Sequence, residues 1–237
     1  MCVRFYTPHW EADLLPCVPS EDTSDGALLL FADPSAFGEK VAAELLMKRS
    51  ESVVVRKGND FTKHDEKSYT IRSHEPSDYE RLISNLVDDK INVSKVCHLR
   101  GLSERLPSQT EEEWVKQTQQ DSYYSLLYIG QALKKYVDQK VSITVLSSLT
   151  YAVGGEPVLY PEKAVHLGPA MVISQETPNL RSWINGSLSP TSPCIKGKVM
   201  VVHTSCDKYA CWWSYSNMKT ERIDIKGISY FWVQMEM

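Results

Sequence analysis

The chain has 237 residues, of which 42% are hydrophobic and 24% charged, and its formal net charge at pH 7 is −4. This balance is typical of a globular protein and excludes a disordered one. Without a basic excess the chain offers no electrostatic footprint for nucleic acid, so we expect no nucleic-acid binding. Six widely scattered cysteines do not form a disulfide scaffold, and we expect reduced, mostly buried thiols.

The longest apolar runs, such as Ala27–Phe31, are far shorter than the roughly 20 residues that cross a bilayer. The first ten residues include Arg4, Pro8 and His9, where a secretory signal needs an unbroken apolar stretch. We therefore expect no membrane association and a cytoplasmic location.

Strand-like and helix-like patterns alternate along the chain. β-prone runs predict strands at 27–31, 52–56, 69–72, 93–99 and 141–146. Helical spacing of apolar residues predicts helices over 36–48, from Pro76 onward, and over 114–136. Because parallel neighbours need crossover connections, this order predicts a Rossmann-like, doubly wound, mostly parallel α/β sheet with helices on both faces.

The sequence also predicts details of the last helix and of the C-terminal part of the chain. The last predicted helix should turn Tyr124, Leu127, Tyr128 and Leu133 inward, and the polar segment 105–113 before it should be a loop. The pattern becomes irregular after Ser187, with candidate strands at 199–203 and 230–236. We expect a single unit over 1–237, with the core at about 1–188, an irregular segment at 189–225 and a closing strand at 226–237.

The corner after the first predicted strand is where a Rossmann domain binds dinucleotide, because glycines there let the backbone approach the pyrophosphate. Here the corner reads Ala32-Asp-Pro-Ser-Ala-Phe-Gly38 and would place a carboxylate beside the phosphates. We expect this corner to be closed to dinucleotide and Asp33 to act in the turn or as a helix cap. Gly154-Gly155 precedes Pro157 and is read as a turn.

Short-chain reductases use a Tyr-x-x-x-Lys pair on one helix face, in which the lysine lowers the tyrosine pKa. Tyr136 with Lys140 and Tyr215 with Lys219 match this spacing, but the first pair crosses a helix end and the second lies in the irregular tail. Chance explains matches of this kind, so neither pair is assigned a catalytic role.

Other candidate site residues also favour structural interpretations. His203, Cys206 and Cys211 fall short of the four ligands of structural zinc. His64-Asp65-Glu66 is expected in a solvated loop within the charged segment 57–67. The aromatic residues beside the cysteines form either a local core patch or a partner contact: Tyr209, Trp212, Trp213 and Tyr215. No serine or cysteine nucleophile has a recognisable motif or histidine partner.

A family pattern is carried by the segment 147–188. Its parts are Glu156-Pro157, Pro161-Glu-Lys-Ala164, Leu167-Gly168-Pro169, Val172-Ile-Ser-Gln-Glu176 and Pro178-Asn-Leu-Arg181. Weaker landmarks follow in the expected order at 5–10, 28–46, 96–99, 125–127 and 227–236. Together they resemble the structural, non-catalytic subdomain of modular polyketide synthase ketoreductases, and they are also similar to the ketoreductase region of animal-type fatty acid synthase.

In that family the ketoreductase has two Rossmann-like halves, of which the first is truncated and braces the second. Only the second holds NADPH, the glycine-rich loop and the catalytic tyrosine. The resemblance implies that this chain has no catalytic, cofactor-binding or metal-binding residues of its own. It also implies a catalytic half as partner, with NADPH bound there, that reduces β-ketoacyl chains. Neighbouring synthase domains and acyl carrier protein are the further candidate partners.

The chain departs from the family between Leu188 and Ile225, where a strand and an amphipathic helix are usual but Ser, Pro, Cys, Trp and Lys dominate. Phe231 also stands before Trp232 where arginine is usual. We expect aromatic residues on the terminal strands, namely Phe5, Trp10 and Trp232, to contact the catalytic half, because aromatic residues dominate buried interface cores.

Two other hypotheses stay open at this point. The chain could be a free-standing interaction module that binds a partner through residues 206–215, which exposure of Trp212 and Trp213 would favour. It could also be a reductase with an unrecognised site, which would require a glycine-lined cleft or a perturbed acid in a pocket.

Overall fold

The computed structural model describes residues 10–13, 26–47, 49, 51–150, 160–187, 198–203 and 229–235. The strands are β1 (Trp10–Asp13), β2 (Ala27–Phe31), β3 (Ser52–Lys57), β4 (Thr62–Asp65), β5 (Ser68–Ile71), β6 (Val93–Gly101), β7 (Val141–Ser148), β8 (Leu180–Ser187), β9 (Lys198–His203) and β10 (Ser229–Met235). The helices are α1 (Ala36–Met47), α2 (Pro76–Asp88), α3 (Glu111–Thr118), the π-helix η1 (Gln119–Tyr124), α4 (Ser125–Tyr136), the 3₁₀-helix η2 (Pro161–His166) and α5 (Leu167–Glu176).

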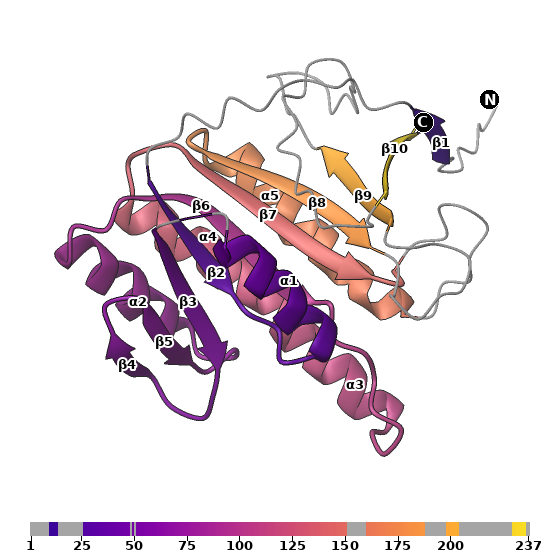
Figure 1. Cartoon of the computed structure of the whole chain (residues 1–237), viewed down its shortest axis with the longest axis horizontal. Helices are drawn as coiled ribbons and strands as arrows, with labels where there is room; N and C mark the ends of the chain where they lie inside the picture. The colour runs from indigo at the N-terminus through magenta and orange to yellow at the C-terminus, as the bar shows by residue number, and fades with distance from the viewer. Residues whose placement is uncertain are drawn as a thin grey trace, which may run out of the picture.

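All ten strands belong to one sheet in the order β1-β10-β9-β8-β7-β6-β2-β3-β5-β4 (Figure 1). The central strands from β8 to β5 run parallel, while β4, β9 and β1 each pair antiparallel with a neighbour. The chain moves from β2 outward through β3 to β5 and then returns to β6 on the other side of β2. The predicted doubly wound, mostly parallel fold is therefore confirmed.

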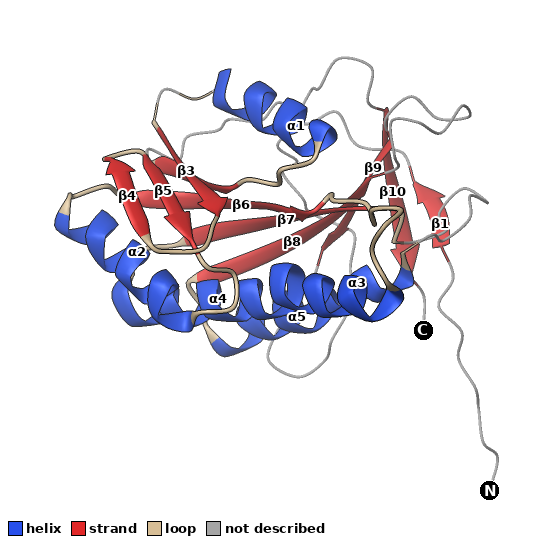
Figure 2. Ribbon diagram, turned by 90° about the horizontal axis from the view of Figure 1, so that it is seen from below, coloured by secondary structure: helices blue, strands red, loops and turns tan. Residues whose placement is uncertain are grey.

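Among the residues that the structure describes, helices lie on both faces of the sheet (Figure 2). Helix α1 lies on one face, and α2, α3, α4 and α5 lie on the other. The larger hydrophobic cluster lies under the group of helices, and a smaller one that includes Leu28, Leu30 and Val41 lies under α1. Every residue of β2 is buried, as expected for a central parallel strand covered on both faces. No helix in the described ranges combines the length and apolarity needed to cross a bilayer.

The segment predicted as a solvated loop at 57–67 contains the edge strand β4, so that prediction was wrong about secondary structure. The four residues of β4 are exposed, which agrees with the predicted solvation. His64 Nε2 lies 2.8 Å from the Thr70 hydroxyl on the neighbouring strand. An edge strand of charged residues resists pairing with other chains, and the polarity of this segment is compatible with a strand for that reason.

The helix predicted over 114–136 begins earlier, at Glu111, because Thr110 and Glu113 form a capping box. It is also interrupted by η1. A π-helical turn inserts roughly one extra residue and so rotates the buried face of the helix after it. Tyr124 is consequently 41% exposed. Leu127 and Tyr128 are only half-buried. Of the four residues predicted to face inward, only Leu133 is fully buried.

Candidate functional site

The return of the chain from β5 to β6 places a topological switch point between β2 and β6. In open α/β sheets, ligands bind in the crevice outside the carboxyl ends of the strands at this point. The two loops that border it begin at Ala32, after β2, and at Leu102, after β6. The topology therefore makes the ends of β2 and β6 the candidate position for a functional site.

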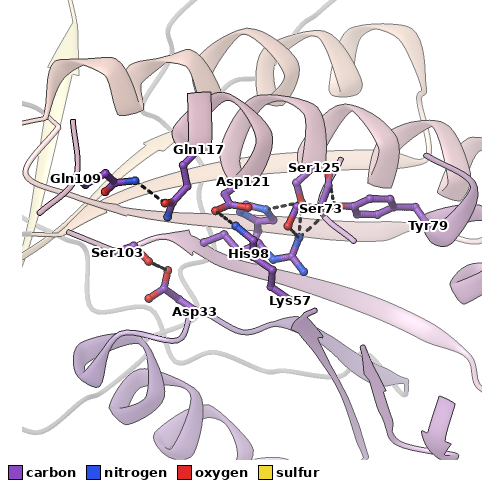
Figure 3. Close-up of polar contacts among 11 residues, drawn as sticks. Asp33, Lys57, Ser73, Tyr79, His98, Ser103, Gln109, Gln117, Asp121 and Ser125 are labelled. Carbon is purple, nitrogen blue, oxygen red and sulfur yellow. Dashed lines mark hydrogen bonds and ion pairs between the residues drawn. The ribbon is translucent and has the colours of Figure 1, made fainter. Parts of the chain in front are cut away.

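Asp33 joins these two loops (Figure 3). Its side chain accepts a hydrogen bond at Oδ1 from the Ser35 amide (2.9 Å). At Oδ2 it accepts from the amide (3.1 Å) and the hydroxyl (2.5 Å) of Ser103, 70 positions away in the sequence. Asp33 is 1% exposed. The predicted turn role of Asp33 is confirmed, and the carboxylate also fastens the β2 loop to the β6 loop.

The helix cap at this corner is Ser35 rather than Asp33. The Ser35 hydroxyl accepts a hydrogen bond from the Gly38 amide (3.0 Å), which satisfies one of the free amides at the start of α1. Gly38 permits close approach of the helix to the loop, because an added Cβ would lie 2.6 Å from Asp33 Cβ and 2.8 Å from the Asp33 carbonyl oxygen. A buried carboxylate therefore lies against the start of α1, where a phosphate-binding Rossmann corner has open backbone.

Lys163 of η2 is buried close to the same corner. Its ammonium donates to the carbonyl oxygen (3.2 Å) and the hydroxyl (3.1 Å) of Ser148 at the end of β7. It also lies 4.8 Å from the ring centroid of Tyr160 and 5.7 Å from that of Trp114. Burial lowers the pKa of Lys163 to about 8, although the negative charge of Asp33, the largest opposing influence, acts to raise it.

Ser148 and Lys163 resemble a nucleophile with an adjacent base, but their geometry favours a structural role. With a pKa of about 8, Lys163 is mostly protonated at pH 7, so it donates to Ser148 instead of accepting its proton. Both residues are 1% exposed. The Ser148 hydroxyl donates in turn to the Leu102 carbonyl (3.2 Å), which ties β7 to the loop after β6. Lys163 lies in the family pattern at 161–164, but the sequence did not predict its buried position or its bond to Ser148.

A second polar cluster lies between β6 and the helices that cover it (Figure 3). Arg100 Nη1 donates to the hydroxyls of Ser73 (3.1 Å), Tyr79 (3.1 Å) and Ser125 (3.4 Å). His98 Nε2 lies 3.0 Å from the same Ser125 hydroxyl. Burial, with smaller contributions from Arg100 and a second buried histidine, holds the pKa of His98 well below its usual range, so His98 is neutral.

Asp121 of η1 borders this cluster and forms an ion pair with Lys57 at the end of β3 (2.8 Å). Sequence reasoning missed the cluster. The sequence signal for it was the presence of His98 and Arg100 in a strand that is buried at nearly every position, Val93–Gly101. A charged residue in a buried strand requires partners, and these come from segments distant in the sequence.

The other residues considered from the sequence are not brought together by the described structure. Tyr136 is the last residue of α4, the Lys135 ammonium lies 5.1 Å from its ring centroid, and Lys140 lies outside the helix. His203 ends β9, while Cys206, Cys211, Tyr215 and the rest of the aromatic segment lie outside the described residues. Within the described part, no three His, Cys, Asp or Glu residues group as metal ligands. Cys97 is a free, buried thiol.

Two of the three predicted interface residues lie on described strands. β1 and β10 pair antiparallel, with Trp10 opposite Met235 and Asp13 opposite Trp232. These two strands form one end of the ten-stranded sheet. Phe5 lies outside the described residues. The contact predicted for these aromatic residues stays a prediction.

Comparison with protein-family models gives a match over residues 26–184, which spans more than half of the chain. The chain belongs to the family described as beta-ketoacyl synthase-like, N-terminal. None of the curated protein sequences matches it.

Among the solved structures that match this chain, two are the most informative. One is described as the adenylation, ketoreductase and pseudo Asub multidomain structure of a keto acid-selecting NRPS module. The match has 20% sequence identity and a TM-score of 0.69, and it covers 80% of this chain and 16% of the NRPS chain. The other is described as an N-terminal ketoreductase from the macrolactin assembly line. The match has 19% sequence identity and a TM-score of 0.59, and it covers 77% of this chain and 36% of the ketoreductase chain. This chain thus spans well under half of either protein.

The family match and these structures confirm the resemblance to ketoreductase structural subdomains at the level of family and fold.

Proposed function

We propose that this chain is the non-catalytic structural half of a polyketide synthase ketoreductase, and that it braces a separate catalytic half. That half would bind NADPH and reduce β-ketoacyl chains on a carrier protein. The observation that carries the proposal is the closed switch point, where the Asp33 carboxylate joins the loops after β2 and β6. A dinucleotide pyrophosphate would meet the negative charge of the Asp33 carboxylate there.

The polar groups around this crevice support a structural role, because they bond to one another. Asp33 is held by Ser35 and Ser103, and Lys163 is held by Ser148. The negative charge of Asp33 favours the protonated form of Lys163 and so offsets part of the effect of burial on its pKa. Catalysis would require reactive groups that face a substrate, and these groups are turned to each other in the interior.

The bracing role is supported by the terminal pair of strands. Strands β1 and β10 extend the sheet beyond the parallel core and place Trp10 and Trp232 at its end. Aromatic residues at the end of the sheet would be suitable anchors for a contact with a catalytic half. NADPH, carrier protein and neighbouring synthase domains enter this proposal only through the partner half.

The experiment is to mix the purified chain with a separately expressed catalytic ketoreductase half and to measure complex formation and NADPH-dependent reduction of a β-ketoacyl thioester. The proposal predicts a stable complex and a reductase more active or more stable than the catalytic half alone. Replacement of Trp10 and Trp232 by alanine should weaken the complex, while Trp114→Phe, in the core, serves as the matched control. Lack of any complex at micromolar concentration would contradict the proposal.

A further inference from the structure

Most of the buried polar atoms without partners in the described residues lie on β6 and on the adjoining ends of α3 and η1. In the described part of the chain, seven buried side-chain nitrogen or oxygen atoms have no hydrogen-bond partner. Five of the seven are His98 Nδ1, Arg100 Nε, Arg100 Nη2, Thr118 Oγ1 and Asp121 Oδ1. Native proteins rarely leave such atoms unpaired, so a cluster of them requires an explanation.

The charges of this cluster are also incompletely paired. Arg100 is 4% exposed. The three groups to which its Nη1 donates are neutral hydroxyls. Asp121 uses Oδ2 for Lys57, and its Oδ1 has no donor. A buried guanidinium without a counter-charge and a buried carboxylate oxygen without a donor are each costly.

The unpaired atoms lie close to one another. His98 and Arg100 are two residues apart on one strand, so they share a face, and both contact the Ser125 hydroxyl. Asp121 is four residues before Ser125 along the same helical run, and Figure 3 shows Asp121 beside Ser125 and over His98. Thr118 lies three residues before Asp121.

The mixture of donors and acceptors identifies the kind of ligand. Arg100 Nε and Nη2 can only donate, whereas Asp121 Oδ1 can only accept. A halide or a fully ionised oxyanion would satisfy Arg100 but would repel Asp121. Water donates and accepts, and buried waters in proteins typically make about three hydrogen bonds to such groups. We propose that the space between β6 and η1 is a bound-water site in which water accepts from Arg100 and donates to Asp121.

The π-helix gives this site its position. π-helical turns are rare, and they recur where a chain must place a group that an α-helix could not. Here the turn carries Asp121 over the end of β6, between the ion pair with Lys57 and the unpaired atoms of Arg100. The bridge would couple Arg100 to Asp121 across two elements and would fix η1 against the sheet. This inference is independent of the proposed function.

The first test is a double-mutant cycle on the full chain, with Arg100→Met, Asp121→Leu and both together. Each single variant leaves the other charge buried without its bridge, so each should lower the folding equilibrium constant strongly. In the double variant, the folding equilibrium constant should be about tenfold higher than the value expected if the two single effects simply multiplied. Ser52→Ala removes an unpaired hydroxyl on β3, outside the cluster, and is the matched control, with little effect expected. Additive effects, within about twofold, would overturn the proposal.

The second test distinguishes water from a direct contact or an anion. A high-resolution crystal structure of the full chain should show water within hydrogen-bonding distance of Arg100 and Asp121 Oδ1. A direct Arg100–Asp121 bond would overturn the proposal. So would saturable stabilisation by inorganic phosphate or chloride at constant ionic strength that is lost in Arg100→Met, because the ligand would then be an anion.

Discussion

Two polar clusters lie at the carboxyl edge of this sheet, and they differ in how completely they are paired. Around Asp33, both carboxylate oxygens have donors, and Lys163 is bonded to Ser148. Between β6 and η1, Arg100 and Asp121 keep unpaired buried atoms. The first cluster closes the position at which this fold binds ligands, whereas the second is the proposed water site. A buried charge alone therefore does not indicate function, because its pairing decides whether the group is structural or still needs a partner.

The largest effect should come from breaking the closed cluster. Asp33→Leu would leave the Ser35 and Ser103 amides without acceptors and Lys163 without its nearby carboxylate. We expect a loss of about 3–5 kcal/mol in the free energy of unfolding, measured by urea denaturation. Asp33→Asn, which keeps one carbonyl oxygen, should lose less. A loss below about 1 kcal/mol for Asp33→Leu would show that the carboxylate does not hold the loops together.

Lys163 should give the closed cluster a distinctive pH dependence. Its pKa is about 8 in the folded chain and near 10.5 when unfolded, so the unfolded state binds more protons between these values. The free energy of unfolding should therefore rise with pH across this window, by about 3 kcal/mol between pH 7.5 and 10.5. Denaturation of the wild type and Lys163→Met at several pH values isolates the effect. Parallel pH profiles of the two proteins would refute it.

His166 should make the same region sensitive to acid. Burial lowers its pKa to about 4 from 6.5, so the unfolded state binds more protons between these values. Stability should fall as the pH drops through this window, by about 1.5 kcal/mol between pH 6.5 and 5. In His166→Gln this loss should be absent, while the loss that comes from the neutral His98 remains. An unchanged acid profile in the variant would contradict the assignment.

The smallest effects should come from the helix caps, which lie outside the buried charges of both clusters. Ser35→Ala and Thr110→Ala remove the hydroxyls that accept from Gly38 and Glu113 amides. Each should cost about 1 kcal/mol in the free energy of unfolding, measured thermally or with urea. The glycine variants at the same positions should cost only a few tenths. If Ser35→Ala cost as much as Asp33→Leu, the cap rather than the carboxylate would hold the corner.

The sequence predicted the sheet better than the site, for a physical reason. Runs rich in apolar residues, such as Ala27–Phe31 and Val141–Ser148, identify buried strands directly, because a strand covered on both faces needs apolar side chains at consecutive positions. The π-turn at 119–124 has no local signature, and it displaced the predicted buried face of the following helix. β4 was missed because an edge strand of charged residues reads as a loop.

The site depends on contacts between distant segments. The charge and position of Asp33 predicted a closed corner, but its partner Ser103 lies 70 residues away and nothing local marks it. Lys163 belongs to the family pattern at 161–164, which assigns it no role, and Arg100 lies just after the predicted strand 93–99. Pairing of this kind follows from the topology, which places the ends of β2, β6 and β7 together.

The switch point closed by Asp33 should not accept a dinucleotide, and calorimetric titration of the purified full chain with NADPH measures this most directly. We predict no saturable heat up to millimolar NADPH, with a catalytic ketoreductase half as the positive control. Saturable binding at micromolar affinity, reduced by mutation around Asp33, would contradict the closed switch point and would make this crevice a candidate active site.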